Sequence, residues 1–338
     1  MDFEIIAAEV LRSLRGKRSQ AAFSRKLGYR SNIVNRWEAR KAFPSASAFL
    51  RVVGAGQRRQ QRSVLLRFFP RPPAELLQIL QQHDAGHTGV PTAELVGAFL
   101  RELQGKTPVV SVAKESGYNR YSVSRWLAGD VEPRLPQFLH LIEVLSRRLL
   151  DFVACCVDPA ELPSLAADWR RLSLARQAAY DQPWSHAVLR ALELQGSGAR
   201  DQTAWLADRL GKSPRDLEAA LALLEATGQV QRRGGRYKLR QVVSVNTSLD
   251  RERALGLKVN WTETALERMR QGAPGNYGYS VFAITKSDLR RLRDIHLEYV
   301  RAMQAVIATS KPGECVGLYC AQLLDLAQRE NALEELER

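Results

Sequence analysis

Histidine and acidic side chains are the groups that most often carry catalysis, and their spacing in this sequence supports none. The five histidines are scattered, and only His83 and His87 lie close together, in a glycine-containing stretch that we interpret as a surface linker rather than a metal site. Charge patterning along a helix explains Asp288 and Glu298. Because the sequence also lacks the GxxxxGKS/T, HExxH and GxSxG motifs, we expect no catalytic residue, no metal and no cofactor.

Four cysteines occur in the chain, which is too few, at uneven spacing, for a disulfide framework or a paired-CxxC zinc site. Two of them, Cys155 and Cys156, are adjacent. A vicinal pair can sense oxidants or soft metals, but two small buried hydrophobic residues are the commoner arrangement. We therefore favour a structural role for both thiols.

Positive charge is concentrated near the N-terminus. The whole chain has a net charge of +14, and residues 1–71 contain 16 Lys and Arg against 4 Asp and Glu, whereas residues 72–150 are neutral. Such an excess attracts a polyanion, although charge alone does not distinguish DNA from RNA or from an anionic lipid surface. The candidate phosphate-binding surface therefore lies in the N-terminal fifth of the chain.

Length and hydropathy predict a folded protein with several domains. At 338 residues the chain is too long for one ordinary core, and its 45% hydrophobic and 25% charged residues are typical of globular proteins. No apolar run reaches the roughly 20 residues that cross a bilayer, and the first residues lack the layout of a secretion signal. We therefore expect a cytoplasmic location and no membrane partner.

The first half of the sequence contains an internal repeat. Shifting the chain by 89 residues aligns residues 11–50 with residues 100–139 without a gap, and 14 of the 40 aligned positions are identical. The matches include Gly28-Tyr29 on Gly117-Tyr118, Arg36-Trp37 on Arg125-Trp126, and Pro44 on Pro133. We therefore interpret residues 1–70 and 92–158 as a first and a second repeat, separated by a linker at residues 71–91.

Each repeat is predicted to contain short helices joined by tight turns. In the first repeat, Ser19 is a candidate N-cap for a helix over residues 20–27. Gly28 permits the turn that follows, and the next helix is expected over residues 31–39. Apolar residues recur at helical spacing in both segments, so that each helix buries one face. This order of elements is typical of a helix-turn-helix.

The segment from Ser19 to Glu38, followed by Pro44, resembles the Cro and phage-repressor class of helix-turn-helix domains, called Xre-like. The resemblance is carried by the Ser-Gln start, the small residue at the second position after the Gln, the turn glycine and the Trp-Glu pair. The sequence departs from the family pattern directly after Glu38, where Ala39-Arg40 stands in place of a glycine.

The resemblance implies that the second helix lies in the major groove of DNA and that the preceding helix crosses the phosphate backbone. It implies that Arg36 can contact guanine and that Asn32 or Asn35 can contact adenine. The residues then expected to face DNA are Lys17, Arg18, Gln20, Arg30, Ser31, Asn32, Asn35, Arg36 and Arg40. The alternative is an ordinary solvated helix face, which the local positive charge disfavours.

The second repeat keeps the glycine turn and the Arg-Trp pair, but Val109 replaces the Gln and Leu127 replaces the Glu. Its corresponding helix offers a second candidate set of DNA contacts, namely Asn119, Arg120, Tyr121, Ser124 and Arg125. Because this repeat is electrically neutral, a packing and dimerisation role is slightly favoured over contact with a second half-site, and both interpretations stay open.

Residues 159–241 follow the order of a winged helix. Helices are expected over residues 187–195, 202–210 and 214–227, and the last one begins after the cap Ser213. Two short strands around Gly234-Gly235 follow them. Arg232, Arg233 and Arg236 on this hairpin are candidate phosphate contacts, whereas the acidic residues of the third helix favour a scaffold or protein-binding role.

Residues 242–338 are predicted to form a small α+β domain for dimerisation or signal reception. Strands are expected over residues 277–285 and 314–322, and a helix between them begins at Lys286 or Ser287 and ends near Thr309. Together with the winged helix, this half resembles the large domain of unknown function that follows a helix-turn-helix in regulators of predatory and gliding bacteria. That resemblance covers roughly residues 150–330 and carries no catalytic motif.

The sequence therefore predicts a mainly α fold with tandem helix-turn-helix bundles, a winged helix and a small α+β C-terminal domain. The predicted function is that of a bacterial transcriptional regulator, a homodimer that binds double-stranded DNA sequence-specifically and responds to a peptide, small-molecule or protein signal. One alternative is an adaptor that binds nucleic acid without sequence preference. Another is an enzyme with a site around Tyr277, Tyr279 and Tyr319, which no constellation of titratable groups supports.

Overall fold

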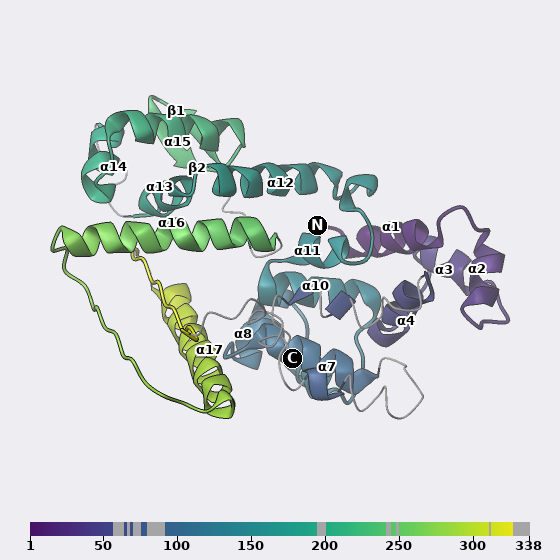
Figure 1. Cartoon of the computed structure of the whole chain (residues 1–338). Helices are drawn as coiled ribbons and strands as arrows, with labels where there is room; N and C mark the ends of the chain where they lie inside the picture. The colour runs from purple at the N-terminus through teal and green to yellow at the C-terminus, as the bar shows by residue number, and fades with distance from the viewer. Residues whose placement is uncertain are drawn as a thin grey trace.

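Two hydrophobic cores organise the chain. The structure, a computed structural model, describes residues 1–56, 64–65, 68–69, 76–79, 92–194, 201–240, 245–247, 250–310 and 312–326. Within them the fold is mainly helical, with one two-stranded sheet. The first core is built from residues between Ile6 and Leu165, and the second from residues between Ala187 and Val230. They form the lower and the upper body in Figure 1.

The two repeats contain the same four helices. Those of the first repeat are α1 (Phe3–Arg15), α2 (Gln20–Lys26), α3 (Ile33–Glu38) and α4 (Ala46–Gly56). Those of the second repeat are α7 (Ala93–Gln104), α8 (Val109–Ser116), α9 (Arg120–Ala128) and α10 (Leu135–Ser146). Gly28 and Gly117 both have a positive φ at the turn after the second helix, the backbone region that glycine adopts without strain.

The first core joins both repeats. Helix α1 packs against α10, and α7 packs against α4. The rings of Phe49 in α4 and Phe138 in α10, which are equivalent positions, both contact Phe152 of α11 (Leu149–Ala154). Leu76 and Ile79, from the predicted linker, are buried in the same core, whereas His83 and His87 lie outside the described residues. The linker segment thus contributes to packing.

The second body begins after a short 3-10 turn, η1 (Pro159–Glu161), and the long helix α12 (Ala166–Asp181), which the sequence pattern did not reveal. It contains α13 (Trp184–Leu192), α14 (Gln202–Leu210), α15 (Pro214–Ala226), β1 (Val230–Arg233) and β2 (Arg236–Leu239). The strands pair antiparallel with Arg233 opposite Arg236. Gly234 and Gly235 both have positive φ, as a tight two-residue hairpin turn requires. The hairpin and the helices predicted over residues 202–210 and 214–227 are therefore confirmed to within one residue, whereas the helix predicted over residues 187–195 begins and ends three residues earlier, at Trp184 and Leu192.

A buried ion cluster joins the first body to α12, which packs on α13 and α15 of the second body. Asp151 of α11, whose side chain is 2% exposed, accepts a hydrogen bond from Arg176 of α12 at 2.7 Å and one from Arg148 at 3.4 Å. Arg176 also donates to the backbone carbonyl of Asn246 at 2.9 Å, and burial lowers the pKa of Arg148. Because an unpaired buried charge is costly, these mutual contacts fix α12 to the first body.

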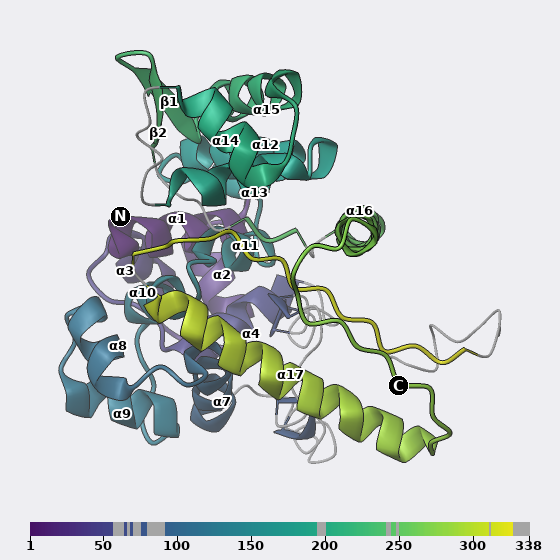
Figure 2. The same ribbon diagram turned by 90° about the vertical axis from the view of Figure 1, so that its left-hand side faces the viewer.

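The C-terminal part consists of two long helices, α16 (Arg251–Arg270) and α17 (Lys286–Thr309), of which the second was predicted. Helix α16 packs on α12, and its Trp261 contacts Trp184 at 5.4 Å between ring centroids. An extended connection leads from α16 to α17 (Figures 1 and 2). Neither helix is apolar enough to cross a membrane, nor is any other helix in the described ranges.

The strands predicted over residues 277–285 and 314–322 are wrong. Both segments run without strand pairing among the described residues, and Tyr279 and Val281 are 96% and 79% exposed. Apolar and β-branched side chains favour an extended backbone, but a strand also needs a neighbour for its hydrogen bonds. The predicted α+β domain is therefore a pair of helices with extended connections.

Candidate nucleic-acid interface

The turn between α2 and α3 is fixed by side chains that bond to the backbone. Ser19 accepts a hydrogen bond from the amide of Ala22 and so caps α2. The buried hydroxyl of Ser24 accepts one from the amide of Val34 at 3.2 Å, at the start of α3. Ser24 thereby satisfies a donor that the helix itself leaves unpaired. Helix α3 begins at Ile33, two residues later than predicted.

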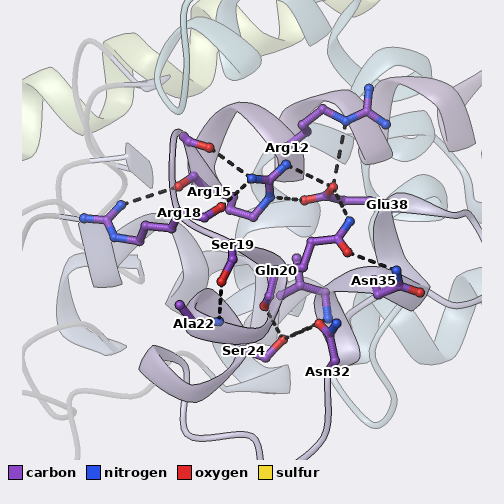
Figure 3. Close-up of polar contacts among 12 residues, drawn as sticks. Arg12, Arg15, Arg18, Ser19, Gln20, Ala22, Ser24, Asn32, Asn35 and Glu38 are labelled. Carbon is purple, nitrogen blue, oxygen red and sulfur yellow. Dashed lines mark hydrogen bonds and ion pairs between the residues drawn. The ribbon is translucent and has the colours of Figure 1, made fainter.

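A buried carboxylate holds α1, α2 and α3 together behind the candidate DNA-binding surface (Figure 3). The side chain of Glu38, at the end of α3, is 5% exposed. Arg15 of α1 donates to both of its oxygens, at 2.6 and 3.2 Å, and Gln20 of α2 donates to one at 2.8 Å. Arg12 lies 3.9 Å away. This carboxylate of α3 is thus held by two arginines of α1 and by Gln20 of α2.

The same cluster orients two residues predicted to contact DNA. The side-chain carbonyl oxygen of Gln20 accepts a hydrogen bond from the side-chain amide of Asn35 at 2.9 Å, while the side-chain amide nitrogen of Gln20 donates to Glu38. Asn32 lies with its carbonyl oxygen 3.3 Å from the hydroxyl of Ser24. Both asparagines are nevertheless exposed to solvent. Their exposed sides can therefore contact a ligand, while hydrogen bonds to Ser24 and Gln20 fix the orientation of the two side chains.

The remaining predicted residues of the first repeat surround this pair. We call the following group the reading face, because all its members are exposed and lie in or beside α3: Arg30, Ser31, Asn32, Asn35, Arg36 and Arg40. Lys17 and Arg18 are exposed in the loop before α2, whose carbonyl oxygens Arg15 helps to hold. Gln20 is half-buried. The structure thus brings every predicted residue of the first repeat to one helix pair and its loops.

Arg40 occupies a backbone position that favours glycine. Its φ is +60°, and the equivalent residue of the second repeat, Gly129, has φ +82°. The missing glycine noted in the sequence therefore does not prevent α3 from ending at Glu38, because Arg40 adopts the left-handed conformation itself. Compared with a glycine, Arg40 adds a cation to the reading face.

Sequence reasoning missed the residues that support the reading face. Ser24, Arg15 and Glu38 were not identified as part of the site, although the structure shows that they position Asn32, Asn35 and Gln20. One signal was available, because Glu38 is the only acidic residue between residues 10 and 71. A lone acid within a strongly basic segment indicates a carboxylate that is paired and buried rather than exposed.

In the second repeat, the candidate residues lie at the start of α9 and along it. Asn119 caps the helix by accepting a hydrogen bond from the amide of Tyr121, and Arg125 lies over the ring of Tyr121, 5.6 Å from its centroid. Tyr121 is 69% exposed. Arg120 and Ser124 are exposed as well. The helix therefore presents a continuous polar and aromatic face to solvent.

The three arginines of the hairpin lie at its tip or next to it. Arg232, Arg233 and Arg236 are exposed, and Arg232 lies over the ring of Tyr237, 5.7 Å from its centroid. Helix α15 beneath them carries the exposed acids Asp216 and Glu218. A cationic tip thus stands beside an acidic helix, and the structure does not join these arginines to the reading face of the first repeat.

The structure does not bring Tyr277, Tyr279 and Tyr319 together. Tyr319 packs against Tyr299, Tyr277 donates to the carbonyl of Ala273, and Tyr279 is almost fully exposed. In the part of the chain that the structure describes, no group of three or more His, Cys, Asp or Glu side chains could hold a metal ion.

Comparison with known proteins concerns the second half of the chain. No curated protein and no solved structure matches the chain. The family profile that matches is described as a domain of unknown function (DUF4423) and covers residues 165–323, which include α12 to α17 and the hairpin but none of the helices of the two repeats. The C-terminal half is thus similar to DUF4423.

Proposed function

We propose that this chain is a transcriptional regulator that binds double-stranded DNA sequence-specifically, with α2 and α3 as a helix-turn-helix and α3 in the major groove. The observation that carries the proposal is the exposed reading face of α3, supported from behind by the bonds of Glu38 to Arg15 and Gln20. A short helix with its polar side chains oriented in this way has the geometry that base recognition requires.

The electrostatics of the first repeat support contact with phosphates. Glu38 is the only acid in a segment of more than 60 residues, and its carboxylate is buried and paired with Arg15. Lys17, Arg18 and Arg40 are exposed cations of this segment. They are placed in the loop before α2 and in the turn after α3, where a bound duplex brings its backbone closest.

The support behind Asn35 favours specific binding over the adaptor alternative. A protein that binds DNA by charge alone needs cations but no fixed amide orientation. Here Gln20 bonds both to Glu38 and to Asn35, so the amide of Asn35 is held in one direction. An asparagine whose orientation is fixed before binding loses less entropy when it pairs with an adenine.

The second body is assigned an accessory role. We propose that α13, α14, α15 and the hairpin form a winged helix whose arginines Arg232, Arg233 and Arg236 touch phosphates. The exposed acids of α15 would repel DNA in a groove, so that helix serves as a scaffold. Helices α16 and α17 expose many apolar side chains, among them Leu255 and Ile307, and are the proposed region for signal reception.

The test is a selection of genomic fragments by the purified protein at about 150 mM salt, in which each base contact is expected to contribute about 1 to 3 kcal/mol. It compares the wild type with a variant that carries Asn32→Ala, Asn35→Ala and Arg36→Ala. A matched control carries Arg170→Ala and Arg171→Ala on α12, outside the proposed surface.

We expect a short sequence motif for the wild type and the control, and loss of that motif for the α3 variant. Wild type and α3 variant selecting the same motif would show that α3 is not the reader. Retention of fragments without any common motif, with a steep dependence on salt, would instead favour the adaptor without sequence preference.

A further inference from the structure

The two repeats meet at a short backbone bridge between equivalent residues. Ser45 and Arg134, which are 89 residues apart like every aligned pair of the repeat, form an isolated antiparallel bridge. The amide of Ala46 donates to the carbonyl of Pro133 at 3.0 Å. The amide of Leu135 donates to the carbonyl of Pro44 at 2.9 Å. Because Ala46 is equivalent to Leu135 and Pro44 to Pro133, these two hydrogen bonds are equivalent to each other.

The helix packing around the bridge has the same reciprocity. Helix α1 of the first repeat lies on α10 of the second, and α7 of the second lies on α4 of the first. An edge-to-face pair recurs in each repeat, Tyr29 on Trp37 at 5.6 Å and Tyr118 on Trp126 at 5.3 Å. The repeats are therefore related by a local two-fold axis through the bridge, as two subunits of an isologous dimer would be.

This axis places one helix-turn-helix pair on each side of the molecule. In Figure 1, α8 and α3 appear on opposite sides of α4 and α10, within the same lower body. Because one continuous core contains both repeats, their two exposed helices are held at a fixed separation. Two-fold symmetric readers in a dimer contact two half-sites of DNA that are related in the same way.

The exposed face of α9 is suited to DNA although the second repeat as a whole is neutral. Nearby acids are engaged elsewhere: Glu115 is paired with Arg147, and Glu132 accepts the amide of Ser47 at the bridge. Asp130 is exposed, but it follows the C-terminal end of α9. At the start of the helix, Arg120 and the solvent-exposed ring of Tyr121 remain available for phosphate and base contacts.

We propose that a single chain occupies two half-sites of one operator, with α3 reading one and α9 the other. This inference rests on the proposed function of α3 and adds a second reader to it. The homodimer expected from the sequence is then unnecessary for binding a two-part site, because the two-fold pairing exists within one chain. The second repeat therefore has both roles, since it packs against the first repeat and contacts DNA through the exposed face of α9.

The two half-sites are different from each other. Arg36 and Arg125 are equivalent and identical, so both half-sites share the base pair that this arginine contacts, expected to be a G·C pair. The other contacts differ, since Asn32 is replaced by Tyr121 and Asn35 by Ser124. The operator is therefore an imperfect inverted repeat, in contrast to the palindrome of a homodimer.

The test combines footprinting on the selected operator with three variants of the full-length chain. One carries Tyr121→Ala and Arg125→Ala, one carries Asn32→Ala and Arg36→Ala, and the control carries Arg170→Ala and Arg171→Ala on α12. We expect each reader variant to lose protection of a different half-site and to bind at least about tenfold more weakly. The control is expected to protect both half-sites, and circular dichroism verifies that every variant is folded.

A second arm leaves the protein unchanged and alters the DNA. Inserting about 5 base pairs, half a helical turn, between the half-sites turns them to opposite sides of the duplex. Because both readers belong to one core, the wild type is expected to bind this duplex no more tightly than a single half-site. Native mass spectrometry is expected to show one chain per operator.

The inference is overturned if the α9 variant protects the operator like the wild type, or if two chains occupy a symmetric site through α3 alone. It is also overturned if the insertion leaves the affinity unchanged. In each of these cases the α3 variant still loses binding, so the proposed function stands. Failure of the proposed function is different, because then the wild type and both reader variants show no operator preference.

Discussion

The two repeats share a fold but differ in what stands behind the exposed helix. At equivalent positions the first repeat has Gln20 and Glu38, and the second has Val109 and Leu127. In the first, Glu38 and Gln20 form a buried polar cluster with Arg15. In the second, Leu127 is buried and brings no polar side chain, and its backbone carbonyl accepts a hydrogen bond from Arg101 at 2.7 Å. Both Gln20 and Glu38 thus have apolar equivalents in the second repeat.

This difference shows that the same helix can be fixed either by a compensated charge or by close packing. In the second repeat, α7 approaches the end of α9 so closely that a Cβ atom on Gly97 would lie 2.8 Å from the backbone of Gly129. In the first repeat, Ala8 and Arg40 occupy those positions. The first repeat thus retains polar support where amide orientation matters, and the second relies on contact between backbones.

The largest expected effect concerns the hydrophobic core that the two repeats share. Phe152 contacts both Phe49 and Phe138, on either side of the local two-fold axis. Phe152→Ala is expected to lower the free energy of unfolding by about 3 to 5 kcal/mol, since it leaves a cavity in a fully buried site. Urea titration measures the loss. Two separate unfolding transitions for the repeats in the wild type would contradict a shared core.

The next largest effect on stability is expected to differ between the two repeats. Arg15→Ala leaves the buried Glu38 without its main partner and is expected to cost about 2 to 4 kcal/mol. The equivalent change, Gln104→Ala, removes a half-buried neutral side chain that donates one hydrogen bond, to the carbonyl of Thr107, and is expected to cost only about 1 kcal/mol. Urea unfolding of both variants gives the comparison. Adding Glu38→Leu to Arg15→Ala, in imitation of Leu127, is expected to recover part of the loss, and equal losses for the two single variants would refute the distinction.

A smaller effect with opposite signs is expected at the end of the exposed helices. In Gly129→Ala the new Cβ would lie 3.1 Å from the Cα of Glu94 at a φ of +82°, so a loss of about 1 to 3 kcal/mol is expected. Arg40→Gly relieves a strained arginine, and a gain of about 0.5 kcal/mol is expected. Thermal unfolding measures both changes, and a loss of stability in Arg40→Gly would show that the left-handed conformation does not strain this arginine.

The smallest effect concerns pH at the contact between repeats. His140 of α10 stacks on Phe3 of α1 at 4.4 Å, and burial, with a contribution from the N-terminal amine, lowers its pKa from the ordinary value of 6.5. The unfolded chain therefore binds this proton more readily than the folded one. The stabilisation from neutral His140 is present above pH 6.5 and is lost as the pH falls through the folded pKa.

Urea unfolding of the wild type at pH 7.5 and 5.5 is expected to show lower stability at the acidic pH. In His140→Gln that decrease is expected to be smaller, since the substituted side chain does not titrate. An identical decrease in both proteins would show that other groups cause it.

Local patterns predicted the helices well because they depend on neighbouring residues. The caps Ser19 and Ser213 and the helix starts at Gln20, Gln202, Pro214 and Lys286 were readable from the sequence. The C-terminal strands were not predictable, since composition at Tyr279 and Val281 favours extension but does not supply a pairing strand. The contacts between repeats join residues far apart in sequence, and only the repeat itself hinted at them.

The exposed part of the candidate site was predictable, and its support was not. Arg30, Asn32 and Arg36 could be placed from the spacing of polar residues on a short helix and from a family resemblance. The roles of Arg15 and Ser24 depend on how α1 and α2 pack against α3, which no local pattern encodes. Glu38 could have been found from its isolation among basic residues.

The most direct measurement of the central claim is the affinity of Arg36→Lys for the selected operator and for a scrambled duplex, by fluorescence anisotropy at several salt concentrations. Lysine keeps the charge of Arg36 but lacks the planar fork that pairs with guanine. We predict a loss of about 1 to 3 kcal/mol on the operator, with unchanged affinity for the scrambled duplex and an unchanged salt dependence. Binding of both duplexes as in the wild type would contradict the assignment of α3 as the sequence-reading helix.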